Sequence, residues 1–423
     1  MKIDLTLEEN LFAPLQAAME EPLAKKHSRS CIVLTDELFV RSGVARVLEV
    51  VQSGREWVQN IQQHTKVALS ASDYFAQLES SRRLAHLEAV GVALQQTQLK
   101  ALRAKTDRLA SIHELDGFEI WAADGHEIEH ACHDKRKKFS DGTERYLGIN
   151  QIFAQDLRTA WVRPLAICDG KEHEIKALKA QSFKALRQQA ARGTLLIYDC
   201  ALIDTAWWLK LKSESQICVI SRCKESMRPV HELPRVWDRT DQRNAGVLAD
   251  EIIGLNNLGQ LRRVRCQDPE THEIHTFLTS EESLPPGIIA LLFRLRWDRE
   301  KSFDEFENKL AEKKAWATSK TAKTIQSHFT ALAYNLLLLA LNDLESQHHL
   351  RDTQVEEKYE RWMERRQAVA EQLARTVNSL VQSVRRISEH SLQILRWLRH
   401  HLRARSTLEA SLSDAPAHFF SYI

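Results

Sequence analysis

Three acidic residues, Asp124, Asp199 and Glu300, stand where separate elements can bring them to one site. Asp124 ends the apolar run GFEIWAAD, Asp199 ends the run TLLIYD, and Glu300 follows in a later helical segment. Side chains converge at strand ends in an α/β sheet, because the backbone is fixed there while the tips face solvent. Three carboxylates can hold two divalent ions about 3.5–4 Å apart, an arrangement suited to phosphoryl transfer. The three residues therefore predict a two-metal site.

Mg²⁺, or Mn²⁺ in its place, is the expected ion of this site. Mg²⁺ prefers oxygen ligands and keeps waters that it shares with substrate phosphates. No CxxC pair with zinc-ligand spacing lies near these positions, which argues against zinc. An aspartate at a strand end is more commonly a turn or capping residue, so the metal hypothesis depends on all three carboxylates acting together.

The segment 291–310, LLFRLRWDREKSFDEFENKL, is expected to form one helix. Its apolar residues recur at steps of three and four, which places one stripe against a core. Arg296 and Glu300 are one turn apart on the flank of that stripe and therefore lie side by side. An Arg/Glu pair at this spacing is most often a solvated ion pair, so its meaning depends on the rest of the chain.

The elements before this helix predict an α/β fold. Strand patterns are expected in 117–124, which ends on Asp124, and in 125–134, 149–155 and 159–167, and three strands in succession imply an antiparallel meander. A helix over 173–192 with Gly193 as its C-cap, a strand over 194–199, a helix over 201–212 and a strand over 216–223 follow. Three strands, helix, strand, helix, strand is the order of the RNase H-like fold, which has a mixed sheet.

The chain is expected to divide into five regions around that core. The segment 227–285 consists of short strands and turns and predicts a β-rich insertion, while the heptad-like pattern near the C-terminus suggests self-association or internal packing. The predicted regions are a helical, DNA-binding segment (1–110), the first part of the core (111–226), the insertion (227–285), the last part of the core (286–346) and a helical, dimer-forming segment (347–423).

Composition limits the classes of protein that fit. The 423 residues carry a net charge of +2 with 27% charged residues, so any nucleic-acid partner must be bound by local basic patches. The seven cysteines form no CxxC pair, which is typical of reduced thiols. The N-terminus lacks a signal-peptide pattern and the longest apolar run, 331–341, is too short for a membrane span. These features predict a cytoplasmic protein without a membrane partner.

Three sequence blocks resemble the DDE transposases of bacterial insertion sequences. WAADGH around Asp124, IYDCALID around Asp199 and LRWDRE ending at Glu300 resemble the family's three catalytic blocks, in the group with a Tyr-x2-Arg-x3-Glu-x6-Lys signature. The resemblance implies an RNase H-like core and catalysis by two Mg²⁺ or Mn²⁺ ions held by these three carboxylates. It also implies double-stranded DNA as the substrate, at element ends and target, and a homodimer acting near the nucleoid.

Two departures from that signature leave an alternative function open. Phe293 occupies the tyrosine position and Glu307 the lysine position, with Lys309 two residues further on. Arg296 keeps the signature arginine, whose guanidinium suits bidentate phosphate recognition. We expect Arg222 to line the DNA channel, and DNA contacts from Phe293, Arg296 and Lys309. The departures favour a catalytically inactive DNA-binding regulator, whereas three intact, mutually repelling acids favour the enzyme.

Overall fold

The structure is a computed structural model of the chain, and it describes a defined set of residues. These are residues 5–20, 33–48, 53–65, 67–139, 141–146, 148–169, 172–181, 183–187, 190–199, 203–224, 227, 229–244, 246–254, 259–267, 273–297, 310 and 314–348. Glu300, Glu307, Lys309 and the predicted helical segment beyond His348 lie outside the described residues.

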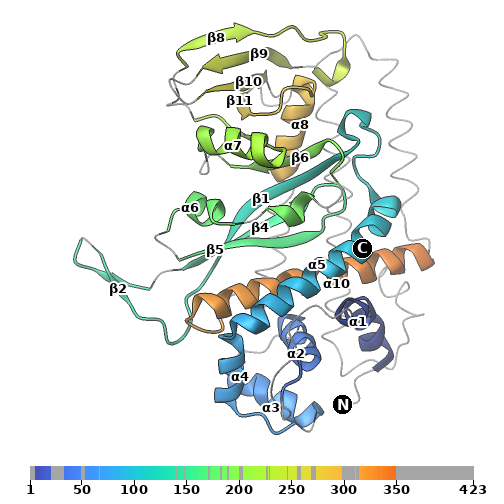
Figure 1. The fold of residues 1–423 in the computed structure, drawn as a ribbon, viewed down its shortest axis with the longest axis vertical. Coiled ribbons are helices and arrows are strands. Elements are labelled where there is room, and N and C mark those ends of the chain that lie inside the picture. The colour runs from blue at the N-terminus through green and yellow to red at the C-terminus, as the bar shows by residue number, and fades with distance from the viewer. Residues whose placement is uncertain are drawn as a thin grey trace.

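In the described part of the chain, nine strands form one mixed sheet, which extends from β8 at the top of Figure 1 to β5 next to the helices. Five of them match the predicted core in chain order: β1 (Phe118–Ile128), β4 (Ile149–Asp156), β5 (Val162–Asp169), β6 (Gly193–Tyr198) and β7 (Ile217–Arg222). β4 pairs antiparallel with β1 and β5, and β6 pairs in parallel with β1 and β7. The predicted three-strand meander is confirmed, and the mixed sheet is compatible with an RNase H-like core.

The β-rich segment after β7 extends this same sheet. Its strands are β8 (His231–Pro234), β9 (Val247–Gly254), β10 (Gln260–Gln267) and β11 (Ile274–Thr279). β11 pairs antiparallel with β7, and the sheet continues through β10 and β9 to β8 at the edge. The strand content predicted for 227–285 is present, and it widens the sheet instead of adding a layer. That this segment is an insertion stays a prediction.

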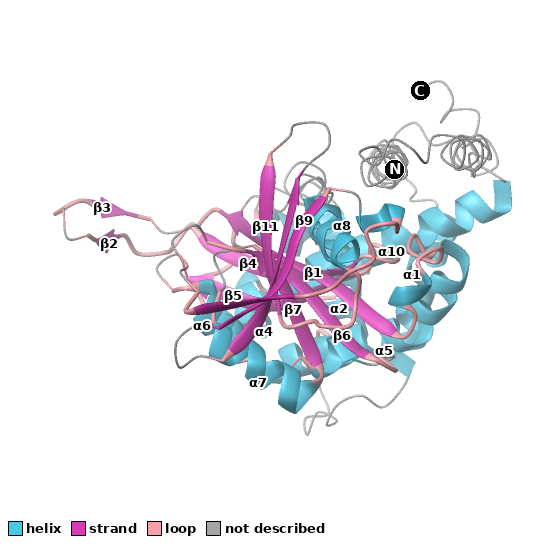
Figure 2. Cartoon of the chain, turned by 90° about the horizontal axis from the view of Figure 1, so that it is seen from above, coloured by secondary structure: helices cyan, strands magenta, loops and turns pink. Residues whose placement is uncertain are grey.

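The two faces of the sheet are covered by different helices. Side chains alternate along β1, so Ile120 packs in the core beneath α8 (Pro286–Trp297), and Trp121 packs in the core on the opposite face. That second core includes residues of α6 (Glu174–Lys179), α7 (Thr205–Ser215) and α10 (Lys320–His348). Viewed along the sheet, α8 and α7 lie on different sides of the strands (Figure 2).

The N-terminal helices share a hydrophobic core with the sheet. They are α1 (Leu5–Glu20), α2 (Asp36–Leu48), α3 (Gly54–Thr65), α4 (Ala71–Leu78) and α5 (Ser81–Thr106), and α1, α2 and α5 pack against α10. Ser70 caps α4, and a second cap at Ser80 starts α5. Within the described residues, Lys320–Leu344 is apolar and long enough to span a membrane, yet most of it is buried inside the protein.

Two sequence predictions about the core are wrong. β1 does not end at Asp124, because residues 124–128 continue to pair with β4. The helix predicted over 173–192 is broken into α6 and a short 3₁₀ turn, Lys184–Arg187, where the Leu186 carbonyl accepts a hydrogen bond of 3.1 Å from the buried Trp121 indole. Gly193 belongs to β6 with a φ of 123°, and a Cβ there would lie 2.7 Å from the Gln216 carbonyl oxygen.

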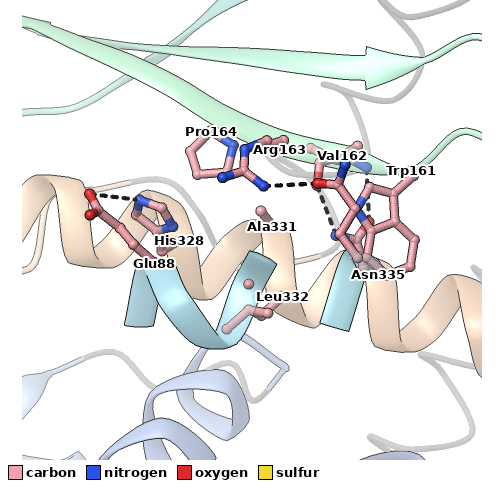
Figure 3. Close-up of a pocket in the computed structure, with 11 residues that line it drawn as sticks. Glu88, Trp161, Val162, Arg163, Pro164, His328, Ala331, Leu332 and Asn335 are labelled. Carbon is pink, nitrogen blue, oxygen red and sulfur yellow. Dashed lines mark hydrogen bonds and ion pairs between the residues drawn. The ribbon is translucent and has the colours of Figure 1, made fainter. Parts of the chain in front are cut away.

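A polar junction joins α10 to the edge strand β5. The side-chain amide of Asn335 makes the two hydrogen bonds that a neighbouring strand would make. It accepts from the Val162 N–H at 2.9 Å and donates to the Val162 carbonyl at 2.8 Å. His328 lies two helical turns before Asn335 on α10, and its Nε2 is 3.8 Å from a carboxylate oxygen of Glu88 (Figure 3). These contacts satisfy backbone groups that an exposed sheet edge would leave to solvent, so they fix the helical region to the sheet.

His328, whose side chain is 12% exposed, should make stability depend on pH. Burial, and then the positive charge of Arg163, lower the pKa of His328 to about 3 from its ordinary 6.5. Below pH 6.5, His328 becomes protonated in the unfolded chain but stays neutral in the folded protein, so the free energy of unfolding falls as the pH falls. Between pH 6.5 and 5.5 this loss is about 1 kcal/mol. Urea unfolding at several pH values should show that His328→Gln removes this component, whereas His113→Gln, at a histidine whose side chain is 86% exposed, leaves it. Equal pH slopes in wild type and His328→Gln would contradict the prediction.

Candidate active site

Asp124 lies in β1, and Asp199 directly follows β6, the strand that pairs with β1 in parallel. In the pairing of β1 with β6, Trp121 stands opposite Leu196 and Ala122 opposite Ile197. Continuing this register by two residues sets Asp124 opposite Asp199, and adjacent strands lie about 4.8 Å apart. The fold therefore brings together the two aspartates to which the sequence pointed.

Asp124 belongs to the sheet face that α8 covers. It has the alternation of Ala122 in β1, and Ala122 packs in one core with Leu292 of α8. β6 ends at Tyr198, whereas β1 continues past Asp124 to Ile128. The last pair between the two strands is Ala122 with Ile197, so Asp124 lies just beyond the paired part of β6. Its carboxylate is thus open on one side while its backbone stays fixed by β4.

Arg222 continues the row of charged residues on this face. β7 pairs in parallel with β6, with Tyr198 opposite Ser221. One further residue places Arg222 opposite Asp199, and Arg222 is exposed at the end of β7. Asp124, Asp199 and Arg222 therefore follow one another across three adjacent strands.

Arg296 reaches this row from α8. Its Nη1 donates a hydrogen bond of 2.8 Å to Oδ2 of Asp124, and its side chain is 5% exposed against 26% for Asp124. The guanidinium lies over the ring of Phe293, 5.3 Å from its centroid, and Phe293 packs on Phe277 with centroids 5.0 Å apart. Phe293 is buried in the core and supports Arg296 from below. The contacts of both residues with DNA stay predictions.

Sequence reasoning missed two polar residues beside the aspartates. Asn150 of β4 donates a hydrogen bond to Glu174 at the start of α6, and its amide lies so close to Gly125 that a Cβ there would collide with it. Burial, together with the negative charges of Asp124 and Asp199, raises the pKa of Glu174, against the opposing hydrogen bond from Asn150. No motif distinguishes Glu174, because only the sheet order places α6 at this end of the molecule.

The described part of the site fits a hard divalent cation. It offers the carboxylates of Asp124 and Asp199, and after burial their negative charges also raise the pKa of Glu174. Within the described ranges no three Asp, Glu, His or Cys residues are grouped closely enough to hold a metal by themselves. A further ligand must come from elsewhere, and Glu300 follows the last described residue of α8 by three positions.

The basic residues of the N-terminal helices are largely engaged inside the protein. Arg82 and Arg83 both pair with Asp36, and Arg103 pairs with Glu119 and Asp156. Arg83 is fully buried. The positive charge that suggested DNA binding by α5 is therefore mostly neutralised by these partners, and the DNA-binding role of residues 1–110 stays a prediction.

Comparison with known proteins agrees with the geometry. The family model of the transposase DDE domain matches residues 116–336, slightly more than half of the chain and all the strands and helices from β1 to most of α10. A search of curated proteins finds no match. The matched region contains Asp124, Asp199 and Arg296 in the arrangement described above. This chain belongs to the transposase DDE domain family.

Proposed function

We propose that the protein binds the terminal repeats of an insertion sequence, cuts phosphodiester bonds there and joins the freed 3′ hydroxyl to target DNA. The observation that carries this proposal is the hydrogen bond from Arg296 of α8 to Asp124 in β1, with Asp199 directly after the neighbouring parallel strand β6. The same helix supplies Arg296 and leads in sequence to Glu300. Membership of the transposase DDE domain family supports DNA as the substrate and metal-dependent chemistry.

In this proposal Asp124, Asp199 and Glu300 hold the metal ions. Two bound Mg²⁺ or Mn²⁺ ions would activate an attacking oxygen and stabilise the leaving oxygen of the phosphodiester. The protein fixes Asp124 through the paired backbone of β1 and β4, so its carboxylate needs little reorganisation. Arg296 balances the charge of Asp124 and is close enough to the carboxylates to orient a DNA phosphate.

Arg222 would bind the DNA backbone next to the reacting phosphate. It is exposed at the same end of the sheet and follows Asp199 across the strands. A cation here offsets the repulsion between the DNA phosphates and the row of carboxylates. We propose that Lys309 also binds this DNA, because it lies near the signature lysine position in the sequence.

The group with the Tyr-x2-Arg-x3-Glu-x6-Lys signature remains our assignment within the family. Arg296 and Glu300 keep their spacing, Phe293 lacks the tyrosine hydroxyl, and Glu307 reverses the charge of the lysine position. Burial of Phe293 under Arg296 supports a packing function of its ring, which phenylalanine retains. Synapsis of two element ends requires two protomers, for which we propose residues 347–423 as the contact. The protein would act in the cytoplasm, at the nucleoid.

A DNA-binding regulator without catalysis is the second candidate. The charge reversal at Glu307 favours it, because a carboxylate near the DNA phosphates weakens binding. The paired placement of Asp124 and Asp199 favours the enzyme, because two acids on adjacent strands repel each other unless a cation uses them.

The test is cleavage of a labelled duplex that carries the element's own end, with Mg²⁺ or Mn²⁺ compared with a chelator. We expect metal-dependent nicking at the end and transfer of the labelled strand into a target plasmid. A duplex of scrambled sequence is the matched control. Specific binding without nicking under either metal would favour the regulator, and Glu307→Lys would then be the first variant to examine.

A further inference from the structure

A two-stranded ribbon projects from the sheet shortly after Asp124. β2 (Lys137–Lys138) and β3 (Glu144–Arg145) pair antiparallel, with Lys137 opposite Arg145, and all four residues are exposed. Figures 1 and 2 both show the ribbon extending away from the sheet and the helices. So short a ribbon buries almost no apolar surface and is marginally stable alone. Its conformation must be maintained by its base and its side chains.

The base of the ribbon is anchored to the protein. Ile128, Ala131, Ile149 and Ala315 belong to a small buried cluster where the two arms of the ribbon leave the sheet. The Ala315 N–H donates a hydrogen bond of 2.9 Å to the Glu129 carbonyl, in a parallel bridge with the segment before α10. The ribbon therefore starts from a fixed point.

The ribbon itself is braced by stacked side chains. His130 and Tyr146 stack with centroids 3.9 Å apart and an interplanar angle of 1°, and the guanidinium of Arg136 lies 5.1 Å from the Tyr146 centroid. Arg145 lies over Phe139 at 4.9 Å and donates to the Asp141 carboxylate at 2.7 Å. Cation–π contacts restrict these long side chains, so the arginines are presented in defined positions.

The charge of the ribbon is strongly positive at its outer part. Residues 135–138 are four consecutive cations, Lys-Arg-Lys-Lys. No described carboxylate lies within 4 Å of any of them, whereas Asp134 at the base is 3.7 Å from Lys323. Cations without a neighbouring carboxylate repel one another on an exposed ribbon, and an anionic partner that binds there offsets this repulsion.

We propose that the ribbon is a DNA-binding arm that grips the duplex beside the reacting phosphate, with residues 135–138 on the backbone. A two-stranded antiparallel ribbon fits the major groove of B-DNA, and Lys and Arg supply the phosphate contacts that set position. β1 carries both Asp124 and the start of the arm, so DNA at the carboxylates continues along the ribbon. This inference rests on the proposed function for its substrate.

Salt-dependent DNA binding by the full chain tests the arm. The probe is a fluorescent 40-bp duplex of random sequence, measured by anisotropy between 50 and 300 mM KCl with a chelator present. Lys137→Gln/Lys138→Gln should reduce the slope of log affinity against log salt by about 2, and weaken binding at 100 mM about 10- to 60-fold. Arg239→Gln/Arg265→Gln removes two exposed cations from the opposite, β8–β10 part of the sheet, and should change neither quantity by as much.

A second measurement on the wild-type protein makes the test independent of folding. Acetylation of Lys137 and Lys138, read by mass spectrometry, should decrease when the duplex is bound and remain unchanged for Lys210 on α7. The proposal that the ribbon binds DNA would be refuted by an unchanged salt slope in the variant, or by unchanged acetylation of Lys137 and Lys138 in the complex. Loss of self-association with unchanged DNA binding would also refute it, and would identify a protein contact. Wild-type protein that binds no duplex at all would instead refute the proposed function.

Discussion

Asp124→Asn and Asp199→Asn should each abolish metal-dependent cleavage of the element end, with rates reduced about 1000-fold or more. Each substitution removes a charged oxygen ligand, and metal ions supply several kcal/mol of transition-state stabilisation. Glu300→Gln should have the same effect if it is the third ligand. Duplex binding in a chelator should remain close to that of wild type, because phosphate contacts by cations determine it.

The two aspartate variants should differ in their free energy of unfolding, because the two side chains have different surroundings. Asp199 is exposed, so its loss should change the free energy of unfolding little. Asp124 accepts the hydrogen bond from the buried Arg296, so Asp124→Asn leaves that guanidinium without its carboxylate. Glu214→Gln, an exposed carboxylate on α7, is the control for cleavage. Wild-type cleavage by any of the three ligand variants would refute the assignment of that residue.

Arg296→Met should destabilise the metal-free protein by about 2–3 kcal/mol. The side chain is buried, and its removal leaves the partly buried Asp124 carboxylate without its partner, a loss that exceeds that of a surface pair. Addition of Mg²⁺ should restore part of this stability, because a bound cation neutralises Asp124 in place of the guanidinium. Urea unfolding with and without Mg²⁺ measures both effects, and Arg294→Met on the same helix is the matched control.

A double-mutant cycle identifies the source of the Arg296 effect. If the unpaired charge is responsible, Arg296→Met/Asp124→Asn should be more stable than the sum of the two single variants predicts. Cleavage by Arg296→Met should be strongly reduced even at saturating Mg²⁺ if the guanidinium also orients the phosphate. Additive stability losses would show that Arg296 acts through packing on Phe293 alone.

The sequence by itself indicated the family of the chain and its candidate ligands. The apolar run before Asp199 predicts a strand that ends at that residue, and β6 does end at Tyr198. The strand order through β7 was also predicted correctly, because strand patterns depend on neighbouring residues. The motif spacing around Asp124, Asp199 and Glu300 was sufficient to indicate the transposase DDE domain family.

Only the tertiary structure decided how those residues are presented. Asp124 is accessible because its neighbour β6 ends beside it, whereas its own strand continues to Ile128, and a strand's own sequence holds no information about where its neighbour stops. The helix predicted over 173–192 breaks where buried Trp121 needs the Leu186 carbonyl. Arg296 pairs with Asp124 across 172 positions of chain. Such contacts depend on packing between distant segments, which local periodicity does not encode.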